Sequence, residues 1–210
     1  MKTEQATYLD FLGAANTKMA IPVFQRMYTW SPWQCEELWE DIINAGKSGE
    51  THFIGSIIYT SEALDGTNGA NELRSIVDGQ QRTTTVTLLF IALRDWLREH
   101  GETCGLTAQA IEERYLYNAT PDGGRAMKFT AAPADHETLV YILEGGEKPE
   151  RYRFSNRMDR NYRFFAEQMA AEDFELEVML AGLRQLFAII VELGGDDNPQ
   201  LIFEGINSKG

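Results

Sequence analysis

The sequence has few cysteines and no long hydrophobic run, and each shortage excludes a class of protein. Its two cysteines, Cys35 and Cys104, show neither CxxC nor Cys/His spacing, so we expect no zinc site and no disulfide framework. The longest apolar runs, such as 88–93 and 187–191, are far shorter than the roughly 20 residues of a membrane span. The N-terminus also lacks the positive flank and apolar stretch of a signal peptide. We therefore expect a cytoplasmic protein with no membrane partner.

Basic side chains are in short supply as well. Nineteen Lys and Arg stand against 32 Asp and Glu, which gives a formal net charge of −13 at pH 7. Such a chain is unsuited to coating nucleic acid nonspecifically, because contacts of Lys and Arg with phosphate supply most of that affinity. The negative net charge does not exclude a local basic site. The densest one is RYRFSNRMDRNYRFF at residues 151–165, where arginines and aromatic rings alternate.

Alternating rings and guanidinium groups can stack on bases and hold phosphates. The candidate DNA-binding residues are Arg151, Arg153, Arg157 and Arg160. The alternative for this segment is an ordinary surface helix, whose aromatic rings face the core while its arginines lie in solvent.

The 210 residues, 43% hydrophobic and 11% aromatic, are enough for one compact core, and their patterns predict an α+β fold. Ser31-Pro32-Trp33-Gln34 has the form of a capping box and predicts a helix that stops at Gly46 and Gly49. Residues 52–60 and 73–78 read as two strands joined by a loose loop. The helix expected at 80–99 is apolar almost all round and therefore buried.

The second half of the chain is expected to be mainly helical. Its helices are expected at 107–117, 134–144, 156–171, 173–186 and 199–206. Residues 126–131 could be a strand, and 187–193 are ambiguous between strand and helix. Near the N-terminus, 7–15 reads as a short helix and 18–23 as an extended segment.

Asp78-Gly79-Gln80-Gln81-Arg82, between the second strand and the buried helix, is the first candidate site. A helix start offers unpaired N–H groups and a partial positive charge, which suit a phosphate. Arg82 opposes the helix dipole there and so favours an anionic partner. Asp78 could hold Mg²⁺ or orient a water, and the glutamines could contact sugar, base or water. Alternatively, Asp78 merely caps the helix and Arg82 pairs with a surface acid.

Two further segments place polar and aromatic side chains where a ligand could bind. IPVFQRMYTW at 21–30 contains Gln25, Arg26 and Tyr28 just before a helix start, although its rings could equally be core anchors. FEGINSKG at 203–210 contains Asn207, Ser208 and Lys209, which could reach a ligand or simply end a helix.

Together these segments resemble the ordered motifs of the N-terminal domain of GmrSD-type modification-dependent restriction systems, a domain of the ParB/sulfiredoxin-like superfamily. The matching segments are IPVFQRMYTW, WEDI at 39–42, HFIGSIIY at 52–59, IVDGQQRTTTVTLL at 76–89 and IFEGINSKG at 202–210. The resemblance is dense over 18–95 and returns at 198–210, whereas 100–197 matches only in helical character. The chain ends within the last motif, as a piece of a longer protein would.

The resemblance implies a small ParB-like mixed α/β core elaborated by helices, and hydrolysis of nucleoside triphosphates, for which Mg²⁺ at Asp78 is the suspected cofactor. It also implies sensing of modified DNA in phage defence, with cleavage by a separate HNH-type nuclease domain or partner subunit. Residues 1–100 would form the nucleotide-binding core, and 101–210 a helical extension closing the pocket within one compact unit. A homo-oligomer is possible.

The site residues that follow from these motifs fall into three groups. The catalytic candidates are Asp78, Gln81 and Arg82, with Asp78 also the metal ligand. The nucleotide-binding candidates are Gln25, Arg26, Tyr28, Gly79, Gln80, Thr83, Asn207, Ser208 and Lys209. His52, His100 and His136 are scattered singly, so we expect no HNH nuclease in this chain.

The sequence therefore predicts a regulatory or sensor domain that hydrolyses nucleoside triphosphates within a restriction system. The P-loop pattern is missing, so the triphosphate would be held by another architecture. The alternative is a module that binds nucleotide or modified DNA without turnover and regulates a partner nuclease.

Overall fold

The computed structural model describes residues 1–195, 197, 199, 201 and 202. Its main sheet has six strands in the order β1-β8-β3-β4-β2-β7. Their bounds are β1 (Lys2–Thr7), β8 (Leu186–Leu193), β3 (His52–Ala63), β4 (Glu72–Asp78), β2 (Thr17–Ala20) and β7 (Phe129–Thr130). The β1/β8 and β3/β4 pairs are antiparallel, and the other three are parallel. Strands from both sides of residue 100 therefore share one sheet.

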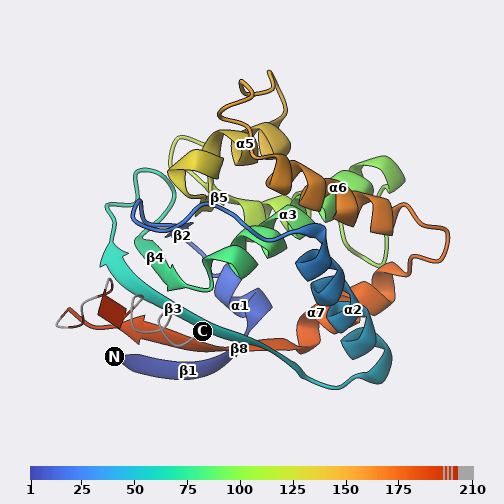
Figure 1. The fold of residues 1–210 in the computed structure, drawn as a ribbon, viewed down its shortest axis with the longest axis horizontal. Helices are drawn as coiled ribbons and strands as arrows, with labels where there is room; N and C mark the ends of the chain where they lie inside the picture. The colour runs from blue at the N-terminus through green and yellow to red at the C-terminus, as the bar shows by residue number, and fades with distance from the viewer. Residues whose placement is uncertain (196, 198, 200, 203–210) are drawn as a thin grey trace.

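Helices cover this sheet and pack against one another (Figure 1). Their bounds are α1 (Tyr8–Leu12), α2 (Pro32–Ser48), α3 (Gln80–His100), α4 (Ala108–Ile111), α5 (Pro133–Glu144), α6 (Asn156–Met169) and α7 (Leu176–Gln185). A π-helical turn, η1 (Glu112–Leu116), continues α4, and β5 (Tyr117–Ala119) with β6 (Arg125–Met127) forms a small second sheet. The α+β prediction is confirmed. Among the described helices, none combines the length and apolarity that crossing a bilayer requires.

Helix α3 lies in the core, as its apolar composition predicts. Leu88, Leu89, Ile91 and Leu93 are completely buried. Four threonines of its first two turns are buried too, and each hydroxyl donates to the carbonyl four residues earlier, at 2.8–3.0 Å. These bonds satisfy polar groups that would otherwise destabilise a buried helix.

The capping box of α2 is present as predicted, since Ser31 and Gln34 bond reciprocally at its start. The helix ends at Gly49, which has a left-handed φ of +71°. The prediction that Gly46 also stops the helix is wrong. A Cβ on Gly46 would lie 2.0 Å from the Val178 carbonyl oxygen, and one on Gly182 1.8 Å from that of Ile42. The two glycines instead let α2 and α7 cross with their backbones in contact.

Several other predictions needed correction. Residues 2–7 form β1, a strand that the sequence patterns did not predict. The helix expected at 107–117 is two short pieces, α4 and η1, followed by β5. The possible strand at 126–131 is split between β6 and β7, and the ambiguous 187–193 is a strand in β8. The helix predicted at 199–206 lies largely outside the described residues.

Candidate functional site

The turn between β4 and α3 sets the geometry of the candidate site. β4 ends at Asp78, and Gly79 takes a left-handed φ of +92° before α3 begins. A Cβ on Gly79 would lie 3.2 Å from both the Ser56 carbonyl oxygen and Ile57 Cγ1. Glycine therefore permits the turn to pack directly on β3.

The first backbone hydrogen bond of α3 runs from the Thr83 N–H to the Gly79 carbonyl, at 2.9 Å. The N–H groups of Gln80, Gln81 and Arg82 precede it and have no acceptor within the helix. They lie at the positive end of a 21-residue helix. Such a helix start is chemically suited to an anion.

Three glutamines next to this turn are buried, with 4–7% of their surface exposed. Gln81 accepts a hydrogen bond from the Thr29 N–H (2.7 Å) and donates one to the Met27 carbonyl (3.2 Å). Gln80 donates to the Gln25 side chain (3.2 Å), which in turn donates to the Val77 carbonyl (2.9 Å). The amides tie the 21–30 segment to the start of α3.

Two more candidate residues, Tyr28 and Thr83, are also bonded inside the protein. The Tyr28 hydroxyl contacts Thr85 Oγ1 at 2.6 Å and accepts from Asn161 Nδ2 at 2.7 Å, and burial raises its pKa. Thr83 Oγ1 donates to the Gly79 carbonyl and contacts the Tyr8 hydroxyl at 3.1 Å. The structure therefore places both hydroxyls in the core.

Asp78, Arg82 and Arg26 keep most of their side-chain bonding capacity. Asp78 is half-buried, and no described residue bonds to its carboxylate or forms an ion pair with it. Arg82 is half-buried and donates from Nη1 to the Ser56 carbonyl at 3.0 Å. Arg26 is exposed on the tethered segment, with no bonding partner in the described part of the chain.

A bulge in β3 accommodates Arg82. The register of β3 against β8 shifts between Phe53 and Ser56, and Gly55 within this shift has a φ of +102°. A Cβ there would lie 2.6 Å from Arg82 Nη2. The missing side chain at Gly55 leaves the space that the guanidinium occupies.

Arg82 lines a cavity of about 240 Å³ between α2 and β3. His52 and Asp41 also line it, and 3.2 Å separates His52 Nε2 from Asp41 Oδ2. Neither residue was predicted from the sequence to belong to the site. The available signal was that each belongs to one of the quoted motif segments, WEDI and HFIGSIIY, and the fold brings those segments to the same cavity.

The family model for the GmrSD restriction endonuclease N-terminal domain matches residues 8–210. The chain belongs to this family. It is therefore part of a restriction system, as its motifs predicted. No curated protein matches the sequence. The β4–α3 turn, the tethered 21–30 segment and the Arg82 cavity all lie within the GmrSD match.

The four candidate DNA-binding arginines of the GmrSD domain differ in whether they have a bonding partner within the protein. Arg153 pairs with Glu137 at 2.8 Å, and Arg157 donates to the Thr29 carbonyl at 2.6 Å. Arg151 and Arg160 are exposed, with no bonding partner among the residues described. Of the aromatic rings, Phe154 and Phe165 are buried, whereas Tyr152 is 77% exposed. The segment thus has aromatic rings in the core and two exposed arginines, Arg151 and Arg160, that are not used by any described residue.

Two further sets of predictions concern the terminal motif and the metal. Asn207, Ser208 and Lys209 lie outside the described residues. Within the described part, the protein brings together no group of three or more His, Cys, Asp or Glu that could hold a metal ion. Magnesium at Asp78 would therefore need phosphate and water oxygens as its other ligands, which is a common arrangement for this ion.

Proposed function

We propose that this GmrSD domain binds a nucleoside triphosphate at the β4–α3 turn and hydrolyses it, and that it acts as a regulatory domain of a restriction system. The observation that carries the proposal is the combination of an unpartnered Asp78 carboxylate and a largely free Arg82 guanidinium, within the described residues, at a helix start whose first N–H groups have no acceptor in the helix. Groups of these two kinds at a helix N-terminus are the chemistry that phosphoryl transfer requires.

The phosphates would lie on the N–H groups at the start of α3, with Arg82 on one side. Arg26 would approach from the 21–30 segment, which Gln25 and Gln81 hold beside the turn. Two guanidinium groups near a transferring phosphoryl group stabilise the charge that develops on its oxygens. In this arrangement the buried glutamines position the segment that carries Arg26.

Asp78 has the right chemistry for Mg²⁺, because its half-buried carboxylate is not used by any described residue. Mg²⁺ commonly binds one or two carboxylates together with substrate phosphates and waters. When bound, it would neutralise charge on the phosphate oxygens. Asp78 would hold the ion or orient the attacking water.

We further propose that the domain senses modified DNA and that a separate HNH-type domain or subunit performs cleavage. The exposed arginines Arg151 and Arg160 support a local DNA contact on a chain whose net charge of −13 disfavours any other. Arg157 links α6 to Thr29 in the tethered segment, so a DNA contact on α6 has a direct connection to the nucleotide site.

The test of hydrolysis is phosphate release from GTP, ATP, CTP and UTP with Mg²⁺, with and without modified DNA. We expect Asp78→Asn and Arg82→Ala each to lower turnover at least 100-fold, the scale of removing one hydrogen bond that stabilises the transition state. Asp173→Asn and Arg163→Ala are matched controls at exposed positions and should retain native turnover in the absence of DNA.

The outcomes separate the two candidate functions. Arg82-dependent nucleotide binding without turnover would favour the non-hydrolysing module over the enzyme. Failure to bind any of the four nucleotides would contradict both forms of the nucleotide proposal.

The DNA contact has its own test. The double substitution Arg151→Glu with Arg160→Glu should weaken DNA binding and flatten its dependence on salt, by about 0.9 in the log–log slope for each phosphate that the protein no longer neutralises. Lys47→Glu, at the end of α2, is the control for one such charge reversal at an exposed site outside this segment. An unchanged affinity for DNA would make Arg151 and Arg160 part of an ordinary solvated surface.

A further inference from the structure

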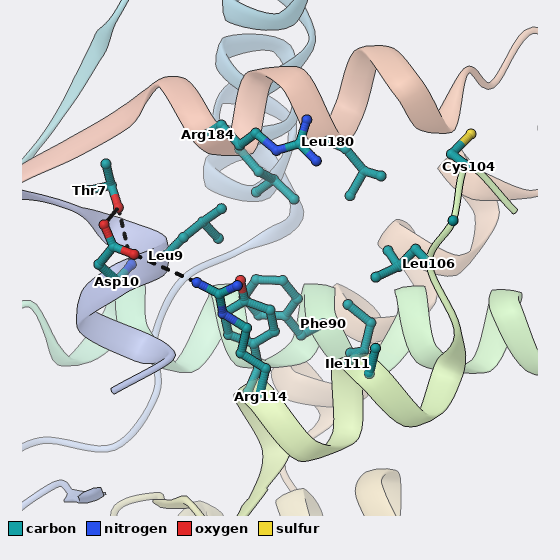
Figure 2. A pocket seen from close by; sticks show the side chains of 14 residues that line it. Thr7, Leu9, Asp10, Phe90, Cys104, Leu106, Ile111, Arg114, Leu180 and Arg184 are labelled. Carbon is teal, nitrogen blue, oxygen red and sulfur yellow. Dashed lines mark hydrogen bonds and ion pairs between the residues drawn. The ribbon is translucent and has the colours of Figure 1, made fainter. Parts of the chain in front are cut away.

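A second cavity has a volume of about 410 Å³. Figure 2 shows the side chains that line it. Its walls come from α1, the middle of α3, the loop before α4, the π-helical turn η1 and α7. The volume falls in the range of roughly 300–1,000 Å³ that small-molecule sites occupy. No residue of the DGQQR motif lines it.

Most of the cavity wall is apolar. Leu9, Leu106, Ile111, Leu180 and Leu183 contribute aliphatic side chains from several segments of the fold. Figure 2 shows labelled members of this set facing a common space. A ligand in that space would therefore bury an apolar body, which is the main source of binding free energy in such sites.

The charged residues of the cavity are two arginines and one aspartate, a net charge of +1 within a chain of net charge −13. Arg114 lies 3.6 Å from Asp10, which is also bonded to Thr7. Arg184 has no hydrogen-bond or ion-pair partner among the described residues. Figure 2 shows the two arginines approaching the space from opposite sides. The arrangement leaves one positive charge uncompensated beside an apolar wall.

The floor of the cavity is held rigidly. The Tyr115 ring stacks on Phe90 with centroids 4.1 Å apart and planes 3° from parallel, and Arg114 lies 5.5 Å from the Tyr115 ring centre. Burial raises the pKa of Tyr115, and the positive charges of Arg114 and Arg184 both oppose that rise, as expected of guanidinium groups near the hydroxyl.

Arg114 and Tyr115 both belong to the π-helical turn η1. Such turns are rare and occur frequently at functional sites, because the inserted residue changes the direction of neighbouring side chains. Here the turn places a ring on the cavity floor and a guanidinium at its edge.

We propose that this cavity binds a small organic anion with an apolar body. The anionic head group contacts Arg114 and Arg184, and the body lies against Leu9, Leu106 and Leu180. Phe90 follows Arg82 by eight residues, which is about 12 Å along the axis of α3. The site is therefore separate from the proposed nucleotide site and does not depend on it.

The experiment compares octanoate with 1-octanol, two ligands with eight-carbon chains that differ in charge. Anilinonaphthalene sulfonate, an apolar anion that fluoresces when buried, serves as the displaceable reporter. We expect saturable 1:1 binding of the reporter, and displacement by octanoate at concentrations at least ten-fold lower than by octanol.

Two variants connect this binding to the cavity. Arg184→Ala should weaken octanoate about ten-fold and change octanol little, because it removes the uncompensated charge and leaves the wall intact. Leu180→Trp should weaken both ligands by filling the space. Arg163→Ala, an exposed arginine on α6, is the matched control and should leave both affinities unchanged.

Thermal unfolding of each variant shows whether it is folded, and Arg184 is exposed enough that its removal should not unfold the protein. The proposal is wrong if the native domain shows no saturable reporter binding, or if Arg184→Ala binds octanoate as tightly as the native chain. Equal affinities for octanoate and octanol would also overturn it, since they would leave the arginines without a role. Loss of nucleotide binding or turnover does not affect any of these results.

Discussion

Replacing Gln81 with alanine separates a positioning role of this glutamine from direct contact with nucleotide. Its side chain joins the Thr29 N–H and the Met27 carbonyl to the first turn of α3, across more than 50 positions of sequence. The side chain is 7% exposed, so water has little access to replace these bonds. Gln81→Ala should therefore destabilise the protein even when no nucleotide is present.

The size of the effect follows from the groups left without partners. Each hydrogen bond removed is worth about 1 kcal/mol, and leaving a buried polar group unpaired raises the penalty to about 1–3 kcal/mol. Both bonds of Gln81 are partly buried. We therefore expect the free energy of unfolding to fall by about 2–4 kcal/mol, which for a chain of this size lowers Tm by about 4–16 °C.

The assay is urea unfolding of the nucleotide-free protein, with the m-value compared between variants. Gln5→Ala, at an exposed position of β1, is the control and should change stability by less than about 0.5 kcal/mol. A destabilisation below that limit for Gln81→Ala would refute the reasoning, because it would show that the amide does not hold the 21–30 segment.

Three other substitutions test the fold and the site. Gly182→Ala should destabilise the protein by about 3 kcal/mol in urea unfolding, because its Cβ would lie 1.8 Å from the Ile42 carbonyl oxygen and force α2 and α7 apart; native stability would refute the crossing. Gly55→Ala should displace the Arg82 guanidinium and lower nucleotide affinity, measured by calorimetry. Gly123→Ala is the control, because its Cβ would meet open space, and it should leave nucleotide affinity unchanged. Burial lowers the pKa of Lys128 from 10.5 to about 8, so the unfolded chain binds more protons between these values and stability rises with pH there. Between pH 7.5 and pH 9.5 the stability of the native chain measured relative to Lys128→Met should therefore rise by about 2 kcal/mol.

Elements specified by neighbouring residues were predictable from sequence. The capping box at Ser31 and the apolar composition of 80–99 depend on contacts within a few residues, and α2 and α3 begin where those patterns place them. The motif at 78–82 was likewise expected at a strand–helix turn, and the structure has it there. Local propensity and hydrophobic pattern are enough for such features.

Features that depend on a distant partner were not predictable in the same way. Residues 187–193 became a strand because β1 and β3 pair with them on either side. Gly46 stayed within a helix because α7 requires the space that a side chain would fill. His52 and Asp41 belong to separate motifs, and the fold joins them at the cavity that Arg82 also lines.

The sequence by itself determined the family, the α+β class and the position of the DGQQR motif, since motif order and short-range periodicity are properties of the chain alone. Only the tertiary structure decided which motif residues are free. Gln80 and Gln81 are bonded to the 21–30 segment, while Asp78 and Arg82 keep bonding capacity for a ligand. The physical reason is that a polar side chain can bind a ligand only where folding leaves it without a partner. The partners of Gln80 and Gln81 lie more than 50 residues away in the sequence, so short-range patterns do not reveal them.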